Sequence, residues 1–174
     1  MTRCSTLRPF LSVLVLLAPV VACSGKPGGP APAAVPAGAA KPSENQTPAD
    51  RCLAIASAKR EVRSDEPAKI TVKHILVKYA GAKRASETVT RTREEACLRA
   101  LDAREKLEQG AEFAEVVASH SEEPGAASRE GSLGAIQRTD VAPPFADAAF
   151  ELGRGEVSHV VETDFGFHVI IRTE

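Results

Sequence analysis

The chain has no tryptophan, a single tyrosine at position 79 and only six phenylalanines among its 174 residues. With so few aromatic side chains, the hydrophobic core must be mainly aliphatic. The four cysteines, at positions 4, 23, 52 and 97, lack the short spacing of a zinc or redox motif. The net charge of −1 lacks the basic excess that general nucleic-acid binding requires. We therefore expect no metal site and no nucleic-acid partner.

The apolar N-terminal segment is too short to cross a membrane, which takes about 20 residues. It covers residues 10–21 and follows two basic residues, Arg3 and Arg8. A short apolar segment behind a basic start is typical of a signal peptide. We expect residues 1–22 to be this signal peptide.

Residues 20–23 resemble a bacterial lipobox, in which the peptidase cuts before the cysteine and that cysteine is acylated. Several acyl chains hold a protein on a bilayer far better than one does. Lipidation of Cys23 would therefore anchor the protein to a membrane. Ser24 at the next position resembles lipoproteins that move to the outer membrane, and we expect a location in the cell envelope facing the periplasm. An ordinary signal peptide that happens to end before Cys23 is the alternative.

Residues 23–50 are rich in Pro, Ala and Gly and contain almost no large apolar side chain. Such a segment cannot bury enough surface to offset the entropy of ordering it. Its prolines favour a semi-extended spacer. We interpret it as a disordered linker that holds a folded domain away from the membrane, although an unused tail fits the composition equally well.

The first half of the remaining sequence predicts a helix, a strand and two more helices. Residues 51–66 form a helical extension, with the helix itself at 51–63. Residues 69–79 alternate and are rich in β-branched residues, which predicts a strand with Val72, His74, Leu76 and Lys78 on one face. A capping box at residues 92–95 begins a helix that runs to 109, with Ala96, Ala100, Ala103 and Leu107 on one face. A second helix covers residues 112–119.

The second half predicts a short strand at 133–137, a short helix from 144 and two strands at 157–163 and 167–172 around a tight turn. The element order is β-α-α-β-α-β-β. It indicates an α+β fold with a four-stranded, mainly antiparallel sheet, preceded by a short helix.

Five motifs in this order resemble the parvulin family of peptidyl-prolyl cis/trans isomerases, also called PpiC-type rotamases. The motifs are VKHILVKY at 72–79, TRTREEA at 90–96, GSLG at 131–134, PFADAAF at 144–150 and TDFGFHVIIRTE at 163–174. The resemblance covers the globular part, so residues 67–174 are expected to form a parvulin domain. It implies isomerisation of X-Pro bonds in unfolded or extended polypeptides during the folding of exported proteins, without a cofactor.

The same resemblance implies roles for individual residues. Parvulins carry one histidine in the first strand and one in the last, which match His74 and His168. Thr163 matches a hydroxyl that joins the histidines, and Glu123 matches an acidic residue beside the susceptible amide. The pocket for the proline ring matches Leu133, Val141 and Phe145.

The sequence departs from the family at the proline pocket and leaves its substrate preference open. Ser132 stands where the family has Asp, and Val141 and Ala142 replace a frequent Met and Gln. These changes leave room for a second function, a parvulin-fold chaperone or peptide-binding module with little turnover. The density of motifs argues against a purely structural envelope lipoprotein. We expect a monomer.

A basic loop follows the first strand and contains Lys83 and Arg84, with Lys78 nearby. In some parvulins a basic pair here binds an anionic group on the residue before proline. The resemblance thus implies a preference for Glu-Pro or Asp-Pro, while a solvated charged loop is the alternative.

Two cysteines, Cys52 and Cys97, remain in the expected mature chain. In an oxidising periplasm they could form a disulfide between the leading helix and the first helix of the domain. The sequence spacing alone leaves this pairing open.

We predict that Cys23→Ser releases the protein from the membrane fraction, because the acyl chains would have no attachment point. Cell fractionation and immunoblotting measure this. A Cys23→Ser protein that stayed in the membrane fraction would contradict the proposed anchor.

Overall fold

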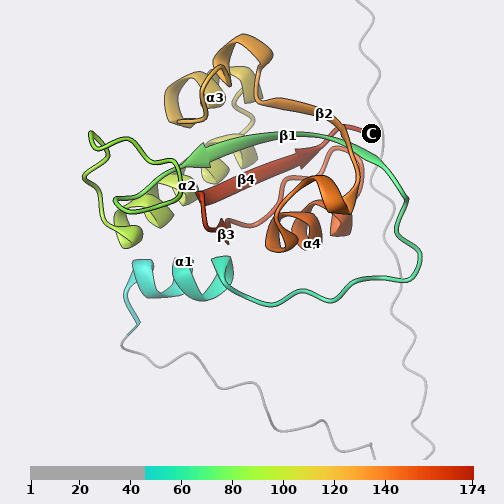
Figure 1. Cartoon of the computed structure of the whole chain (residues 1–174), viewed down its shortest axis with the longest axis horizontal. Coiled ribbons are helices and arrows are strands. Elements are labelled where there is room, and N and C mark those ends of the chain that lie inside the picture. The colour runs from blue at the N-terminus through green and yellow to red at the C-terminus, as the bar shows by residue number, and fades with distance from the viewer. Residues whose placement is uncertain (1–45) are drawn as a thin grey trace, which may run out of the picture. The chain divides into compact units, whose positions relative to one another are not determined.

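The computed structural model describes residues 46–174 (Figure 1). The expected signal peptide, the lipidated Cys23 and all but the last residues of the linker lie outside the described residues. Within the described part of the chain, no helix has the length and hydropathy needed to cross a membrane.

Four antiparallel strands form one sheet in the order β2-β1-β4-β3, as Figure 1 shows. Their bounds are β1 Ile70–Val77, β2 Ser132–Ile136, β3 Val161–Thr163 and β4 Gly166–Arg172. The central strands, β1 and β4, are buried on both faces, because alternate side chains pack into two separate hydrophobic clusters. The predicted α+β fold, its element order and its antiparallel sheet are confirmed.

Helices cover both faces of the sheet. On one face, Ile75 and Val77 of β1 pack against α2 (Arg93–Glu108) and α3 (Phe113–His120). On the other face, Val72 packs against α4 (Pro143–Glu151). The predicted capping box of α2 is present, and its alanine face is fully buried at Ala96, Ala100 and Ala103. Small side chains there let α2 approach the sheet closely.

The leading helix differs from its prediction. It was expected at 51–63, but α1 is Pro48–Ala56. It begins earlier because Thr47 and Asp50 form a capping box with Pro48 in the first helical position. It ends at Ala56 because the following segment makes tertiary contacts instead, including an ion pair of 2.6 Å between Arg60 and Glu151. The predicted helical extension at 51–66 is therefore wrong in its bounds.

The third strand is also shorter than the predicted 157–163. Val157 pairs with Ile171 in an isolated bridge, and the next pair along is Val161 with His168. Between these two pairs, three residues (158–160) on one side thus oppose two (169–170) on the other, which is the geometry of a bulge. At this point the Ser158 hydroxyl accepts a hydrogen bond from the Ile170 N–H at 2.9 Å. Two single 3₁₀ turns, Ala127–Arg129 and Arg138–Asp140, lie in segments expected to be loops.

A disulfide joins Cys52 of α1 to Cys97 of α2, with their Cα atoms 6.0 Å apart. Both side chains are buried in the cluster beneath the sheet. The bond closes a loop with a sequence separation of 45. In the chain-entropy model, closing a loop of this length stabilises the folded state by about 4 kcal/mol. The disulfide thus makes α1 a fixed part of the domain.

Candidate active site

Two histidines meet at the centre of the sheet. His74 lies on β1 and His168 on β4, and the register places them diagonally opposite each other on the face that carries α4. Their rings are stacked, with centroids 5.5 Å apart and planes inclined by 14°. The Nδ1 atoms are 3.3 Å apart. Both side chains are almost inaccessible, at 4% and 5% exposure.

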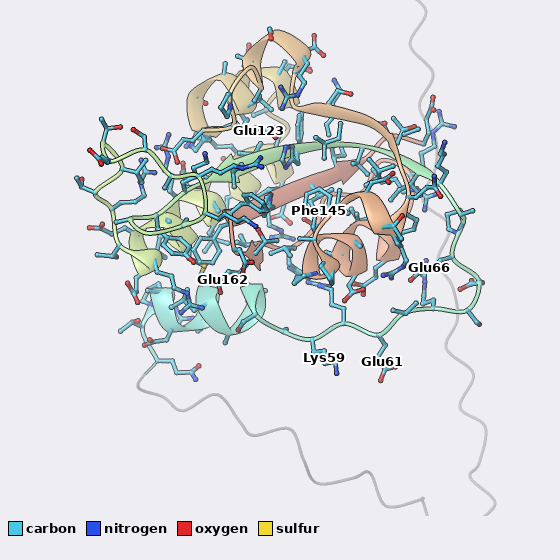
Figure 2. All side chains as sticks on the ribbon, in the orientation of Figure 1. Lys59, Glu61, Glu66, Glu123, Phe145 and Glu162 are labelled. Carbon is cyan, nitrogen blue, oxygen red and sulfur yellow. A yellow bond between two sulfur atoms is a disulfide. The ribbon has the colours of Figure 1, made fainter. Side chains whose placement is uncertain are left out.

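Phe145 of α4 packs edge-to-face against both imidazoles. Its ring centroid is 5.6 Å from that of His74 and 5.2 Å from that of His168, with interplanar angles of 77° and 89°. Perpendicular aromatic packing is a favourable geometry. Figure 2 shows Phe145 on the part of α4 that faces the sheet. Phe145 thus fixes the position of the ring pair while also bordering the cavity described below.

A continuous chain of hydrogen bonds runs through the histidines. The Phe165 backbone N–H donates to Thr163 Oγ1 at 3.1 Å, and Thr163 Oγ1 lies 2.8 Å from His168 Nε2. At the other end, His74 Nε2 lies 2.7 Å from Glu123 Oε2.

With Glu123 as a carboxylate and both imidazoles neutral, the hydrogen bonds have one consistent proton arrangement. A carboxylate only accepts, so His74 carries its proton on Nε2 and leaves Nδ1 as an acceptor. His168 must then donate from Nδ1, which leaves its Nε2 to accept from the Thr163 hydroxyl. All four ring nitrogens of the two histidines thus take part in the hydrogen-bond chain.

Two pKa shifts concern Glu123 and His168, the two groups that flank His74 in the hydrogen-bond chain. The hydrogen bond from His74 lowers the pKa of Glu123 and outweighs the opposing effect of burial, with Arg129 contributing further. Arg129 also forms an ion pair with Glu123. Burial, reinforced by the neighbouring His74, lowers the pKa of His168 to about 3. Glu123 is therefore ionised and His168 neutral around pH 7.

The backbone around His74 explains why glycine stands at position 131. The His74 N–H donates to the Gly131 carbonyl at 2.8 Å. Gly131 has a φ of +72°, and a Cβ there would lie 2.5 Å from the His74 carbonyl oxygen and 2.9 Å from Val117 Cγ2. Only glycine allows this close approach. The Glu122 N–H donates to the Leu76 carbonyl at 2.7 Å, which fixes the segment that carries Glu123.

All ten residues predicted for catalysis or substrate binding border one cavity of about 590 Å³. They are His74, Lys78, Lys83, Arg84, Glu123, Leu133, Val141, Phe145, Thr163 and His168. We call this space the active-site cavity. Its apolar side is formed by Leu133, Val141 and Phe145, the residues expected to hold a proline ring. Among the described residues, no group of acidic, histidine and cysteine side chains could hold a metal ion.

The basic loop packs against the turn between β3 and β4. Lys83 Nζ lies 5.2 Å from the centroid of the Phe165 ring, and Arg84 Cζ lies 5.7 Å from it. The Lys83 N–H donates to the Asp164 carbonyl at 2.7 Å. Lys78 has a different position from the other two, because it is buried and its Nζ donates to the Arg84 carbonyl at 2.8 Å. Lys78 thus holds the loop in place.

Sequence reasoning missed Arg129 and Phe165. Arg129 reaches Glu123 from the unpredicted 3₁₀ turn, and Phe165 was read only as part of a turn. No sequence pattern pointed to either contact. Of the other histidines, His120 is buried and lies 2.9 Å from Asp102 Oδ2, while His159 is exposed. Both lie outside the active-site cavity.

Comparisons with known proteins agree with this geometry. Residues 74–174 match the family model described as the PPIC-type PPIase domain, or rotamase. The chain is 40% identical over 108 residues to the peptidyl-prolyl cis-trans isomerase pin1 of Schizosaccharomyces pombe, covering 60% of this chain and 62% of that protein. It is 39% identical over 70 residues to the foldase protein PrsA of Halalkalibacterium halodurans, covering 40% of this chain and 21% of that protein.

A solved structure extends the likeness to three dimensions. The peptidyl-prolyl isomerase ESS1 from Candida albicans superposes with a TM-score of 0.55 and 29% identity, covering 66% of each chain. The sheet, the histidine pair and these matches define a peptidyl-prolyl cis/trans isomerase domain. The chain belongs to the PPIC-type, or parvulin, family, as its motifs predicted. It spans less than two thirds of the length of the pin1 and PrsA proteins.

We predict that the free energy of unfolding falls by about 2 kcal/mol between pH 7 and pH 5 because of His168. In the unfolded chain this histidine takes up a proton below its ordinary pKa of 6.5, whereas in the folded chain its pKa is about 3. The unfolded state therefore binds more protons in this window, and stability is lost as the pH falls through 6.5.

Urea denaturation at a series of pH values measures this effect. His168→Gln should remove this part of the pH dependence, whatever its effect on stability at pH 7. Equal pH slopes for the wild type and His168→Gln would contradict a buried, neutral His168.

Proposed function

We propose that the protein is a peptidyl-prolyl cis/trans isomerase that accelerates X-Pro isomerisation in unfolded or extended polypeptides during the folding of exported proteins. One observation carries this proposal. The predicted histidines, Glu123 and the apolar residues Leu133, Val141 and Phe145 all border the same cavity. Family membership and the relative named as a foldase support the same activity.

The reaction requires rotation about a bond with partial double-bond character, with a barrier of ~18–20 kcal/mol. At the twisted transition state the amide resonance is lost, so the carbonyl oxygen carries less negative charge and the proline nitrogen is more basic. A site accelerates the reaction when it binds this twisted form better than either planar isomer. Leu133, Val141 and Phe145 would hold the proline ring while the rest of the peptide turns.

Glu123 and the histidines would favour the twisted amide without exchanging a proton with it. The ionised Glu123 borders the cavity, and a negative charge beside the amide repels the planar form, whose oxygen is more negative, more than the twisted form. His74 and His168 use all their ring nitrogens in the hydrogen-bond chain. Their role is therefore to form a rigid floor and to position Glu123.

We further propose the domain organisation expected from the sequence, a signal peptide at 1–22, a lipidated Cys23 and a linker before a periplasmic domain. The disulfide between Cys52 and Cys97 supports this proposal, because disulfides persist in oxidising compartments. In this organisation α1 would be the first element of the folded domain. We propose that this domain acts as a monomer.

We predict that the wild type shortens the proline-limited phase of a refolding protein, which normally lasts tens to hundreds of seconds. His74→Ala and His168→Ala should each lower kcat/KM by about tenfold, equivalent to about 1.4 kcal/mol of transition-state stabilisation. Stopped-flow fluorescence of the refolding protein measures these rates, and circular dichroism checks that each variant is folded.

His159→Ala is the matched control, because this exposed histidine lies outside the cavity, and its rate should equal that of the wild type. A wild-type chain that binds the unfolded protein without shortening the slow phase would instead support the chaperone or peptide-binding alternative. The departures at Ser132, Val141 and Ala142 are the observation that favours that second candidate.

We predict a preference for Glu-Pro over Ala-Pro peptides of about fivefold in kcat/KM, since an exposed charge-assisted contact is worth about 1 kcal/mol. Lys83 and Arg84 border the cavity, and neither forms an ion pair with another described residue. The double variant Lys83→Gln/Arg84→Gln should abolish the preference, as should high salt. Lys69→Gln, at an exposed lysine away from the cavity, is the control. Equal rates for both peptides in the wild type would contradict the prediction.

A further inference from the structure

A second cavity of about 540 Å³ adjoins the active-site cavity. The two share three bordering residues, Ala142, Thr163 and Asp164. One wall of this second space is formed by residues 56–60, which lie outside the segment 74–174 that matches the family model. In Figure 2, Lys59 marks this segment and Glu162 marks β3 near α1. We call this space the flanking cavity.

The wall at residues 56–60 is fixed by two independent contacts. The disulfide from Cys52 to Cys97 holds α1, in which Ala56 is the last residue and is buried. At the other end of the wall, Arg60 forms its ion pair with Glu151 of α4. The wall of the flanking cavity is therefore held in place by the fold for as long as α1 stays packed against the domain.

The charges around the flanking cavity do not suit an ion of either sign. Most of its charged side chains are neutralised by ion pairs, which are Arg60–Glu151, Asp147–Arg138 and Glu162–Arg93. The remaining two, Lys59 and Asp164, have opposite signs. A phosphate or a cation would find no net opposing charge here.

The remaining surface of the flanking cavity suits an extended polypeptide. Its apolar part is formed by Ala56, Ala142, Pro143, Pro144 and Val161. The whole of β3 borders the cavity, and β3 is an edge strand of the sheet. On the free side of β3, no described residue forms a hydrogen bond to its backbone. An edge strand of this kind can pair with an added peptide strand.

We propose that the flanking cavity binds an extended stretch of the polypeptide substrate next to the X-Pro bond, pairing it with the free edge of β3. This proposal rests on the proposed isomerase function and deepens it. The two cavities meet at Ala142, Thr163 and Asp164, so a single chain can occupy both. The protein would then select proline sites that lie within extended, unfolded segments over prolines in short peptides.

The test compares the binding of two peptides to the full chain. One is a short peptide around an X-Pro bond, and the other carries about six further residues on each side, enough to span about 20 Å as a strand. We expect the longer peptide to bind with a Kd about tenfold lower. Fluorescence anisotropy measures the Kd, and isomerisation of both peptides is followed separately by NMR exchange.

Two variants test the location. Ala58→Trp should fill the flanking cavity and remove the advantage of the longer peptide, while leaving the short peptide unchanged. Ala54→Trp is the matched control, because Ala54 is also exposed but lies on α1 away from the cavity. It should keep the tenfold difference.

Modified peptides test strand pairing without changing the protein. The longer peptide is N-methylated on alternate flanking residues, in two versions shifted by one residue. Strand pairing uses every second N–H, so one version should lose the advantage and the other should keep it. Loss of the advantage in neither version would overturn pairing with β3.

The outcomes separate this proposal from the isomerase function. Equal Kd values for the long and short peptides, together with normal isomerisation, would overturn the flanking site alone. Absence of isomerisation in both peptides would contradict the proposed function whatever the Kd values are. If the longer peptide gained its advantage only after deletion of residues 24–45, the cavity would belong to the chain's own Pro- and Ala-rich segment, which would also overturn the proposal.

Discussion

His74 and His168 meet where the two central strands pair, and water hardly reaches either ring. Burial keeps His168 uncharged, and the hydrogen-bond chain fixes the orientation of both rings. The rest of the site is arranged around this contact. Phe145 packs α4 against the histidine pair. Thr163 links the β3–β4 hairpin to His168, and Glu123 links the segment between α3 and β2 to His74. A change in the histidine pair would therefore disturb three separate parts of the chain.

The hydrogen-bond chain has a different chemical character at each end. At one end the acceptor is a carboxylate, Glu123, which is partly exposed and further held by Arg129. At the other end the donor is a backbone N–H in the β3–β4 turn, which stays in place without any ionised group. Lys83 and Arg84 lie over that turn. The active-site cavity thus has a negative group on one side and positive groups on the other, and a bound amide would lie in the field between them.

Local signals in the sequence were sufficient for most of the fold. The capping box before α2, its alanine face and the strand at β1 each depend on residues close together in the sequence, and all three are confirmed. The meeting of His74 and His168 is different, because 94 residues separate them and only the family resemblance predicted it. The bulge at Ser158 and the early end of α1 depend on tertiary partners that leave no periodic signal. The contact of Arg129 with Glu123 depends on a 3₁₀ turn, and the contacts of Phe165 with Lys83 and Arg84 depend on the packing of two loops. Neither leaves a periodic signal in the sequence.

The disulfide has a topological consequence for the site. The covalent ring that it closes, residues 52–97, contains the strand with His74 and the whole basic loop, while Glu123, Phe145 and His168 lie outside it. The exposed stretch of that loop is the natural point of attack for a protease. A single cut there would open the ring into a linear connection but would not divide the molecule, because the two pieces would remain joined through sulfur. The basic loop is thus a part of the site where a protease can cut the backbone while the disulfide keeps the two pieces in one molecule.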